Sequence, residues 1–319
     1  MLEQEGFEPI IVDDMSTGHM WAVRGTLIKG DIGDSALINH LIQEYKPLAI
    51  MHFASKILVG ESMQKPQDYY LDNVSKGLVL FKAAADNGIP VIFSSSAAVY
   101  GTPETVPIPE DARLEPESVY GETKLVLERA LNWFSQRIDA RYISLRYFNA
   151  AGAWPDKGLG EAHPVETHLI PLTLMAGAGQ TEALRVFGDD YPTEDGTCIR
   201  DYVHVIDLAK AHLLALRYLL DNGKSQVFNL GSQTGYSVMQ VIKTAERVIG
   251  KPIPTRITQR RPGDPAVLIA SSGKIREVLG WQAQRELTDM IADAWEFYNG
   301  TGHRNPGHKR IFRPGETGG

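Results

Sequence analysis

Tyr120 and Lys124, four positions apart in the segment YGETK, are the residues whose types and spacing most directly suggest chemistry. If this segment begins a helix, both side chains project from one face and can meet. A phenol with a pKa near 10 is a poor base at neutral pH, and lowering that pKa by about 3 units requires roughly 4 kcal/mol of preferential phenolate stabilisation. A nearby ammonium group can supply part of it, so the pair is a candidate base with its activating cation.

A run of serines at 94–96 ends an apolar segment, and Ser96 precedes Tyr120 by 24 residues. Proteins built on a parallel β-sheet usually bind their ligands at the carboxyl ends of the strands. Each signal alone has an ordinary explanation, because residues four apart often pair on a helix surface and serines often cap turns. The combination favours a catalytic site.

The elements that would position these residues follow from the apolar pattern. Short apolar strand candidates alternate with helical patterns, which predicts an α/β fold with a Rossmann-like, doubly wound parallel sheet. The strand candidates are 10–12, 48–53, 91–95, 142–147 and 227–230, and the helix candidates are 73–87, 123–138, 237–249 and 287–298.

The N-terminal segment suggests a dinucleotide-binding fold. Residues 1–9 resemble the last turn of a helix that stops at Gly6, and the strand 10–12 ends at Asp13. A carboxylate there can accept hydrogen bonds from a ribose, although Asp13 and Asp14 could also be a turn pair. The first strand and the glycine-rich phosphate turn would lie about 20 residues before Asp13, outside these 319 residues. We therefore expect these residues alone to bind a dinucleotide weakly.

Composition narrows the class of protein further. The 32 Lys and Arg residues against 39 Asp and Glu residues give a net charge of -7, which argues against nucleic-acid and membrane-surface partners. The single cysteine, Cys198, rules out an internal disulfide and is expected to be a buried, inert thiol. The nine histidines show no metal-ligand spacing, so no metal site is expected. No apolar run reaches the length of a membrane span, and a reducing cytoplasm is the expected compartment.

Several further segments occur together in one family. They are VDDMSTG (12–18), KGDIGD (29–34), HFAS and VGES (within 52–62), PQDYYLDNV (66–74), FSSSAAVYG (93–101), YGETK (120–124), LRYFNAAGA (145–153), HLIPL (168–172), VFGDDYPTEDGTCIRDYVHVIDLAKAH (186–212), FNLGS (228–232) and RRPGD (260–264). On these segments the chain resembles the extended short-chain dehydrogenase/reductase superfamily, and within it the UDP-glucose 4-epimerase family.

The resemblance implies a role for each matching residue. Tyr120 would be the catalytic base and acid, Lys124 would lower its pKa and hold the nicotinamide ribose, and Ser96 would bond the sugar hydroxyl. The implied cofactor-binding residues are Asp13, Asp14, Asp31, Ile32, Phe53, Ala54, Asn73, Ser94, Tyr120, Lys124, Tyr147 and Phe148. The implied substrate-binding residues are Ser96, Tyr120, Asn149, His168, Leu169, Arg185, Phe187, Arg200, Arg261 and Asp264. Among them, Arg200 and Arg261 suit a diphosphate because guanidinium groups match phosphate oxygens.

The chain also departs from the family pattern. The family's glycine-rich turn is absent from these residues. The lysine after the HFA segment, Lys56, stands one position earlier than in the family and is therefore given no cofactor role. In the family's NNV segment, Asp72 replaces the first amide, which leaves Asn73 as the cofactor residue.

The implied activity is an NAD-dependent isomerase that inverts C4 of UDP-glucose or UDP-galactose through a transient 4-keto sugar. The alternatives are a related epimerase of UDP-glucuronate or UDP-GlcNAc, a dTDP-glucose 4,6-dehydratase, or an inactive nucleotide-sugar-binding fragment. A dehydratase needs an Asp-Glu pair beside the serine, and Ser95, Ser96 and Ala97 stand there instead. Val267 falls where the family gates the C2 substituent, so we expect room for an N-acetyl group.

The same resemblance assigns the domains. We expect an NAD-binding Rossmann-like domain over residues 1–150, with return segments near 197–235. Residues 151–196 and 236–298 would form a smaller α/β domain that binds the UDP-sugar, and 299–319 would be a tail. The expected assembly is a cytoplasmic homodimer.

Overall fold

The computed structural model describes residues 1–261 and 263–300, so most of the predicted tail lies outside the described residues. The chain divides into two compact units. The first comprises Met1–Phe148, Ala209–Gly231 and Ala270–Gln282, and the second comprises Asn149–Leu208, Ser232–Ile269 and the chain from Ala283 onward. The chain was expected to return to the first unit near 197–235. The return begins later because strand β8 (Ile199–His204) pairs with strands of the second unit.

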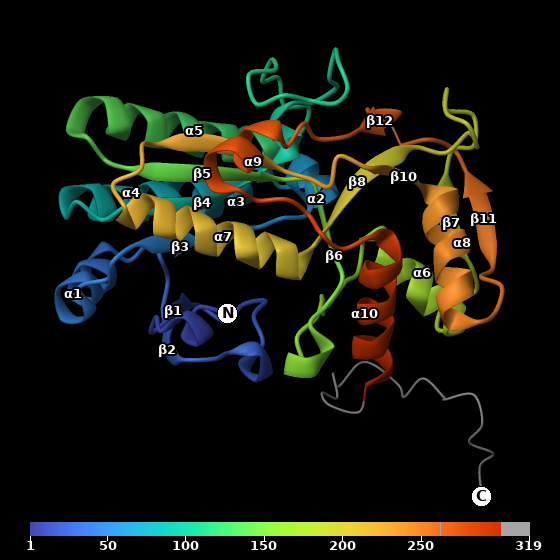
Figure 1. Cartoon of the computed structure of the whole chain (residues 1–319), viewed down its shortest axis with the longest axis horizontal. Helices are drawn as coiled ribbons and strands as arrows, with labels where there is room; N and C mark the ends of the chain where they lie inside the picture. Colours follow the sequence, from blue (N-terminus) through green and yellow to red (C-terminus); the bar gives the residue numbers. More distant parts are fainter. Residues whose placement is uncertain (262, 301–319) are drawn as a thin grey trace, which may run out of the picture. The chain divides into compact units, whose positions relative to one another are not determined.

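The first unit is built on a parallel sheet with the strand order β3-β4-β5-β9 (Figure 1). Its strands are β3 (Ile50–His52), β4 (Val91–Ser96), β5 (Tyr142–Tyr147) and β9 (Gln226–Leu230). Each is short and mostly apolar, as strands covered on both faces must be. All pair in parallel, with Ser96 opposite Tyr147 at the carboxyl end. The predicted α/β fold with a parallel sheet is confirmed.

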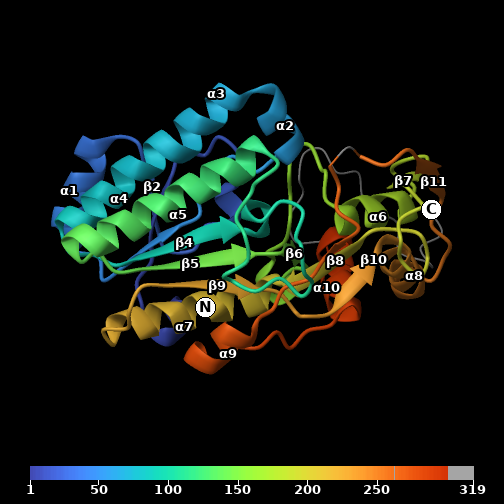
Figure 2. The same cartoon turned by 90° about the horizontal axis from the view of Figure 1, so that it is seen from above.

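Helices cover both faces of this sheet (Figure 2). One face carries α1 (Ser35–Tyr45), α4 (Lys76–Asp86) and α5 (Val119–Ile138), and the other carries α7 (Val205–Leu220) and α9 (Gly273–Leu279). The predicted helix 73–87 begins within a π-helical turn at Tyr70–Ser75, which follows α2 (Val59–Gln64) and α3 (Pro66–Tyr69). Short 3₁₀ turns occupy Glu3–Glu5, Met20–Ala22, Ala97–Val99 and Pro155–Lys157.

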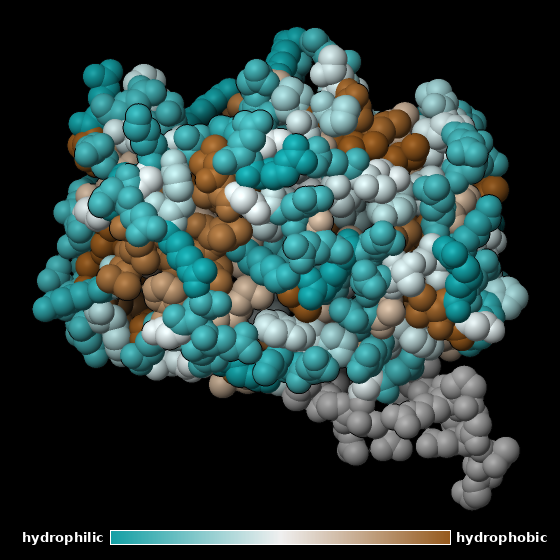
Figure 3. All heavy atoms as spheres, viewed as in Figure 1, coloured by the Kyte–Doolittle hydropathy of each residue, from teal (hydrophilic) through white to brown (hydrophobic). Residues whose placement is uncertain are grey.

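The N-terminal strands form a separate parallel pair, β1 (Ile10–Asp13) and β2 (Thr26–Lys29). Strand β3 pairs with β4, and among the described residues no strand pairs with its other edge. The residues that flank β3 are apolar and open to solvent, with Leu48 61% and Phe53 57% exposed. Figure 3 shows hydrophobic surface, in brown, over the part of the first unit where β3 is drawn in Figure 1.

The second unit combines small sheets with three helices. Strand β8 pairs with β6 (Asn149–Ala151) and β12 (Val267–Leu268) in parallel and with β10 (Gly235–Ser237) in antiparallel, while β7 (Leu184–Phe187) pairs with β11 (Thr255–Thr258). The helices are α6 (Leu169–Gly177), α8 (Val238–Ile249) and α10 (Leu287–Asn299). They enclose a core that includes Ile170, Val241 and Met290. In the described part of the chain, no helix has the length and apolar character needed to cross a membrane.

Candidate active site

Strand β4 and helix α5 bring together the three predicted catalytic residues. Ser96 is the last residue of β4, and Tyr120 and Lys124 lie in the first turns of α5. Ser118 caps this helix, since its hydroxyl accepts a hydrogen bond from the Gly121 amide at 3.1 Å. The Tyr120 amide donates to the Ser62 hydroxyl at 3.1 Å. The start of α5 is therefore fixed beside the carboxyl end of β4.

Lys124 is a buried cation held against the strand. Its side chain is 2% exposed, and Nζ donates to the backbone oxygen of Ser94 at 3.0 Å. Nζ also lies 5.7 Å from the centre of the Tyr120 ring and 5.2 Å from that of Phe93. Burial lowers the pKa of Lys124 to about 7, because desolvation disfavours the charged amine.

The pKa of the Tyr120 phenol is raised, whereas the sequence predicted that Lys124 lowers it. Burial raises the pKa of Tyr120, and the opposing effect is a hydrogen bond with the Ser96 side chain. The lysine lies beside the ring, and its charge is itself weakened by burial. Ser96 is thus the neighbour that favours the phenolate in the protein without a bound cofactor.

A buried polar chain continues from Lys124 through the sheet. The Ser94 hydroxyl lies 2.7 Å from the Tyr147 hydroxyl, which lies 2.5 Å from His212 Nε2. The His212 ring packs on Phe53 with ring centres 5.0 Å apart. Ser94, Tyr147 and Phe53 are predicted cofactor residues, whereas His212 was not among the predicted residues. The sequence feature that could have pointed to His212 is its place at the end of the family segment VHVIDLAKAH.

The carboxylates among the predicted cofactor-binding residues lie at the end of β1 and shortly after β2. Asp13 Oδ1 accepts a hydrogen bond from the Met15 amide at 2.7 Å, and a β carbon at Gly18 would lie only 3.1 Å from the same oxygen. Asp14 accepts from the Ser16 amide at 2.8 Å, and its bonds with Ser16 hold the pKa of Asp14 below its usual value. Gly18 therefore allows the backbone to approach the Asp13 carboxylate closely.

Asp31 lies two residues after the end of β2 and carries the third predicted carboxylate. Its Oδ2 is 2.8 Å from Lys76 Nζ and its Oδ1 accepts from the Gly33 amide at 2.8 Å. The Lys76 hydrogen bond is the largest reason why the pKa of Asp31 is lowered. Ile32, next to it, is half-buried.

Asn73 ties the loop after β3 to helix α5. Its Oδ1 accepts from the Lys56 amide at 2.8 Å, and its Nδ2 donates to the Lys56 carbonyl at 3.0 Å and to Thr123 Oγ1 at 3.2 Å. Lys56 Nζ lies 3.5 Å from Asp72. Ala54, in the same loop, is exposed. Asn73 thus has a visible positioning role, and its predicted cofactor contact stays a prediction.

Phe148 and Asn149 connect the end of β5 to the second unit. Phe148 is 9% exposed, and its amide donates to the Leu230 carbonyl at 3.1 Å. Asn149 begins β6, pairs with Tyr202 and is exposed.

The second unit gathers four of the predicted substrate residues. Arg200 in β8 forms an ion pair with Asp264, and the Arg261 guanidinium lies 4.0 Å from the centre of the Phe187 ring. Charges of Arg200, Asp264 and Arg261 all act on the Cys198 thiol, whose pKa is raised mainly by burial. Two cations therefore lie near the buried cysteine.

Arg185 and Leu169 contact other residues than Arg200, Arg261, Asp264 and Phe187. Arg185 is an exposed residue of β7 opposite Arg256 in β11, and Leu169 is the first residue of α6, packed against the core of the second unit. Neither is brought into the cluster of Arg200 and Arg261 by a contact that the structure shows.

His168 is engaged by two carboxylates of its own loop. Its Nδ1 lies 2.6 Å from Glu161 and 2.9 Å from Glu166, and these bonds raise the pKa of His168 to about 10. Glu161 also lies 3.2 Å from His163 Nε2. Donor atoms of Glu161, His163 and His168 lie within 4.8 Å of one another, although the spacing of the histidines in the sequence did not indicate this grouping. Hydrogen bonds within the group already engage these atoms.

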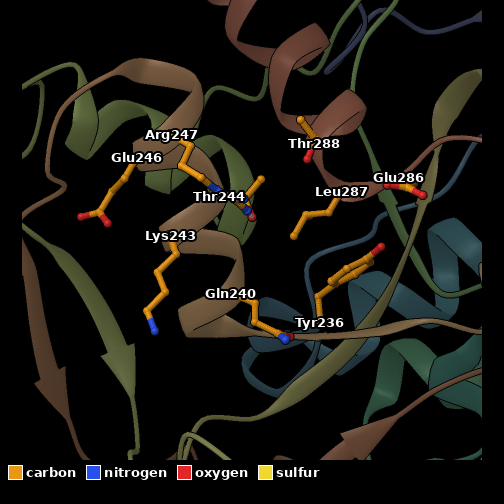
Figure 4. Close-up of a pocket in the computed structure, with 9 residues that line it drawn as sticks. All are labelled: Tyr236, Gln240, Lys243, Thr244, Glu246, Arg247, Glu286, Leu287 and Thr288. Atoms are coloured by element: carbon orange, nitrogen blue, oxygen red, sulfur yellow. Dashed lines mark hydrogen bonds between the residues drawn. The ribbon is translucent and has the colours of Figure 1, made fainter.

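A cavity of about 650 Å³ opens on the second unit between α8 and the start of α10 (Figure 4). Its lining includes Tyr236, Lys243, Arg247 and Leu287. None of the predicted site residues lines it.

Comparison with known proteins identifies the relatives of the chain. The family model described as GDP-mannose 4,6 dehydratase matches residues 13–294. A UDP-glucose 4-epimerase of Halalkalibacterium halodurans is 44% identical over 300 residues, which cover 93% of this chain and 90% of that protein.

The solved structures that resemble this chain are also of UDP-glucose 4-epimerases. The UDP-glucose 4-epimerase of Brucella ovis, crystallised with NAD, is 43% identical with a TM-score of 0.90, over 92% of this chain and 91% of that one. The enzyme of Stenotrophomonas maltophila, with bound NAD and formylated UDP-arabinopyranose, is 38% identical with a TM-score of 0.90, over 93% and 92% of the two chains.

Proposed function

The chain belongs to the UDP-glucose 4-epimerase family, and on that premise we propose that it interconverts UDP-glucose and UDP-galactose by inverting the configuration at C4 of the hexose. The reaction is an isomerisation that depends on NAD. The observation that carries the proposal is the meeting of Ser96, Tyr120 and Lys124 at the carboxyl end of β4, in a chain similar to these epimerases along nearly its whole length.

Two groups of the first unit suit the ribose hydroxyls of a dinucleotide. Lys124 Nζ can donate three hydrogen bonds, and the one that the structure gives it goes to Ser94, which leaves donors for ribose hydroxyls. The Asp13 carboxylate, at the end of β1, suits the hydroxyls of the other ribose. The chemistry that a bound NAD⁺ would supply is a hydride acceptor and donor for C4 of the sugar.

The residues of this chain then supply the proton transfers. Tyr120 accepts the proton of the C4 hydroxyl as the sugar is oxidised to a 4-keto sugar, and it gives the proton back when C4 is reduced on the opposite face. Ser96 stabilises the phenolate by its hydrogen bond and orients the C4 hydroxyl. Lys124 supplies positive charge next to the ring and holds the ribose.

The second unit would hold the UDP part of the substrate. Arg200 and Arg261 are arginines, whose planar guanidinium groups bind phosphate oxygens in pairs. Asp264 fixes the Arg200 side chain by an ion pair, and Phe187 supports Arg261 by stacking. The remaining predicted substrate residues, including Asn149, His168, Leu169 and Arg185, stay part of this proposal.

A dehydratase is the other reaction class that the matching family model suggests. That reaction must remove water from the sugar, which requires an acid and a base beyond Tyr120. Ser95 and Ala97 flank Ser96 where that pair would stand, and the Ser95 hydroxyl is bonded to Glu128 at 2.5 Å. The absence of titratable groups at these positions favours the epimerase.

We propose further that the protein acts as a homodimer in the cytoplasm. The helical segment after β3 carries apolar side chains on its surface, with Val59 47%, Met63 58% and Leu71 52% exposed. Two copies could bury these side chains in an isologous contact. A reducing compartment suits the unpaired Cys198. Sedimentation equilibrium that gives the mass of one chain would contradict the dimer.

The activity is tested directly by supplying the purified protein with NAD and UDP-galactose and following UDP-glucose by chromatography. We expect the two sugars to reach equilibrium from either side. Elimination of water to a 4-keto-6-deoxy sugar would instead identify a dehydratase, and no product from either sugar would contradict the proposal.

A further inference from the structure

Helix α5 carries a third ionisable residue on the same face as the proposed catalytic pair. Glu128 follows Lys124 by four positions, as Lys124 follows Tyr120. Its carboxylate receives two parallel hydrogen bonds from Arg146 of β5, with Nε 2.9 Å from Oε1 and Nη2 2.6 Å from Oε2. The side chains are 6% and 4% exposed. This is a bidentate ion pair in the interior of the first unit.

The ion pair also reaches the strand that ends at Ser96. The Ser95 hydroxyl donates to Glu128 Oε1 at 2.5 Å. Three neighbouring residues of β4 thus face this side of α5, because the Ser94 carbonyl accepts a hydrogen bond from Lys124 and the Ser96 side chain is the hydrogen-bonding neighbour of Tyr120.

Arg146 extends the contact to the segment that joins β4 to α5. Its Nη1 donates to the Tyr100 hydroxyl at 2.7 Å and to the Glu110 carbonyl at 2.9 Å. The Tyr100 hydroxyl in turn donates to Asn229 Oδ1 of β9 at 2.7 Å. Since Ser96 and Tyr120 stand at the two ends of this segment, the network holds the connection between them.

Stability alone does not account for such a pair. Taking two charges out of water is costly, and hydrophobic residues of similar volume often replace a buried ion pair without loss of stability. Such residues would not fix which turn of α5 faces Ser95, because apolar contacts are not directional. A shift of α5 by one turn would move Lys124 and Tyr120 about 5.4 Å along β4.

We propose that Glu128 and Arg146 are positioning residues that set the register of α5 on β4 and thereby hold Tyr120 and Lys124 at the reacting sugar. The inference rests on the proposed epimerase activity. Neither residue touches substrate or cofactor in this account. Their effect acts through the distances from Tyr120 to Ser96 and from Lys124 to Ser94, which join α5 to β4.

The test replaces the pair by apolar residues in the NAD-loaded enzyme, as the double variant Glu128→Leu/Arg146→Met. The matched control is Arg141→Met, which removes an arginine that precedes the same strand and donates to the Leu219 carbonyl at 2.6 Å, at the opposite end of β5. We expect the double variant to unfold at a temperature similar to the control and to lose about 100-fold in kcat with little change in KM.

The pH profile separates this role from general loosening. A shift of α5 moves Tyr120 away from Ser96 and so removes stabilisation from the Tyr120 phenolate. The rise of kcat with pH should therefore move to higher pH in the double variant and stay in place in the control. Ultraviolet titration of tyrosinate, with the Tyr120→Phe background subtracted, should give the same shift without any turnover.

Each outcome decides the inference. A double variant with the kcat and pH profile of the control would overturn it. If the double variant does not fold, the variant Ser95→Ala tests the inference, because it removes only the hydroxyl that bonds to Glu128. A lower kcat with the same shift of the pH profile to higher pH would support the inference. An unchanged kcat and pH profile would overturn it. Failure of the wild-type enzyme to interconvert the sugars would instead contradict the proposed function, while the tyrosinate titration would still test the positioning.

Discussion

The ammonium nitrogen of Lys124 lies 5.7 Å from the centre of the Tyr120 ring, yet its hydrogen bond goes to the backbone of Ser94. The cation is close enough to act on a phenolate by its charge while its position is fixed by the strand. Because it is buried, the same charge destabilises the folded protein. This relationship makes Lys124 a residue whose function and stability effects have opposite signs.

Replacing Lys124 by methionine should therefore stabilise the protein without cofactor while slowing turnover. The pKa of Lys124 is lowered from 10.5 to about 7 by burial. Below about pH 7 both folded and unfolded states hold the proton, and the folded state bears the full penalty of a buried ammonium. Between the two pKa values only the unfolded state keeps the proton, so the penalty fades as pH rises.

Thermal unfolding of Lys124→Met without NAD checks this prediction. We expect a gain of a few kcal/mol near pH 6 that shrinks toward about pH 10. The exposed Lys82, which pairs with Asp86 on the surface of α4, provides the control, and Lys82→Met should give little change at either pH. A Lys124→Met variant that is less stable near pH 6 than the wild type would contradict the prediction.

Two adjacent arginines should differ in their effect on substrate binding. Arg260 is paired with Asp190 at 2.6 Å, whereas the Arg261 guanidinium stacks on Phe187. We expect Arg261→Ala to weaken UDP binding about tenfold or more, since charge-assisted bonds contribute about 1.5–3 kcal/mol. Arg260→Ala should change it little. Titration calorimetry with UDP measures both, and equal losses would remove Arg261 from the proposed diphosphate site.

Val267 is expected to decide whether N-acetylated sugars are accepted. It lies in β12 opposite Ile199, beside the strand that carries Arg200, and is half-buried. A small residue there leaves room for an N-acetyl group, while a tyrosine would exclude it, because steric exclusion discriminates strongly. We expect the wild type to epimerise UDP-GlcNAc and UDP-glucose, and Val267→Tyr to lose mainly the former.

The ratio of kcat/KM for the two sugars measures this gate. Val267→Ala serves as the control, since it enlarges the space and should keep both activities. Equal loss of both activities in Val267→Tyr would indicate a packing role for Val267.

Local patterns were sufficient to predict the parallel sheet. The apolar runs 91–95 and 142–147 coincide with β4 and β5, because strands covered on both faces need continuous apolar sequence. The YGETK spacing likewise predicted a helix start that carries Tyr120 and Lys124. Helix α7 was missed because the segment that contains it was interpreted only as part of the family match.

Long-range contacts of the site could not be predicted from spacing. His212 meets Tyr147 across 65 positions of the chain, and Arg146 meets Glu128 across 18, so no local periodicity reports either contact. The sequence also could not predict which electrostatic effect determines the pKa of Tyr120. The YxxxK pattern suggests that the lysine lowers the pKa of the tyrosine, whereas burial, which a pattern does not reveal, raises it.

Turnover by Tyr120→Phe, measured together with UDP binding and NAD content, tests the central claim most directly. The substitution removes the phenol oxygen that accepts and returns the proton and leaves the ring in place. We predict that UDP and NAD are bound as in the wild type, while conversion of UDP-galactose to UDP-glucose falls about 10²- to 10⁴-fold, the usual contribution of a positioned acid–base group. Conversion at a rate near that of the wild type would show that another group moves the proton and would contradict the assignment of Tyr120.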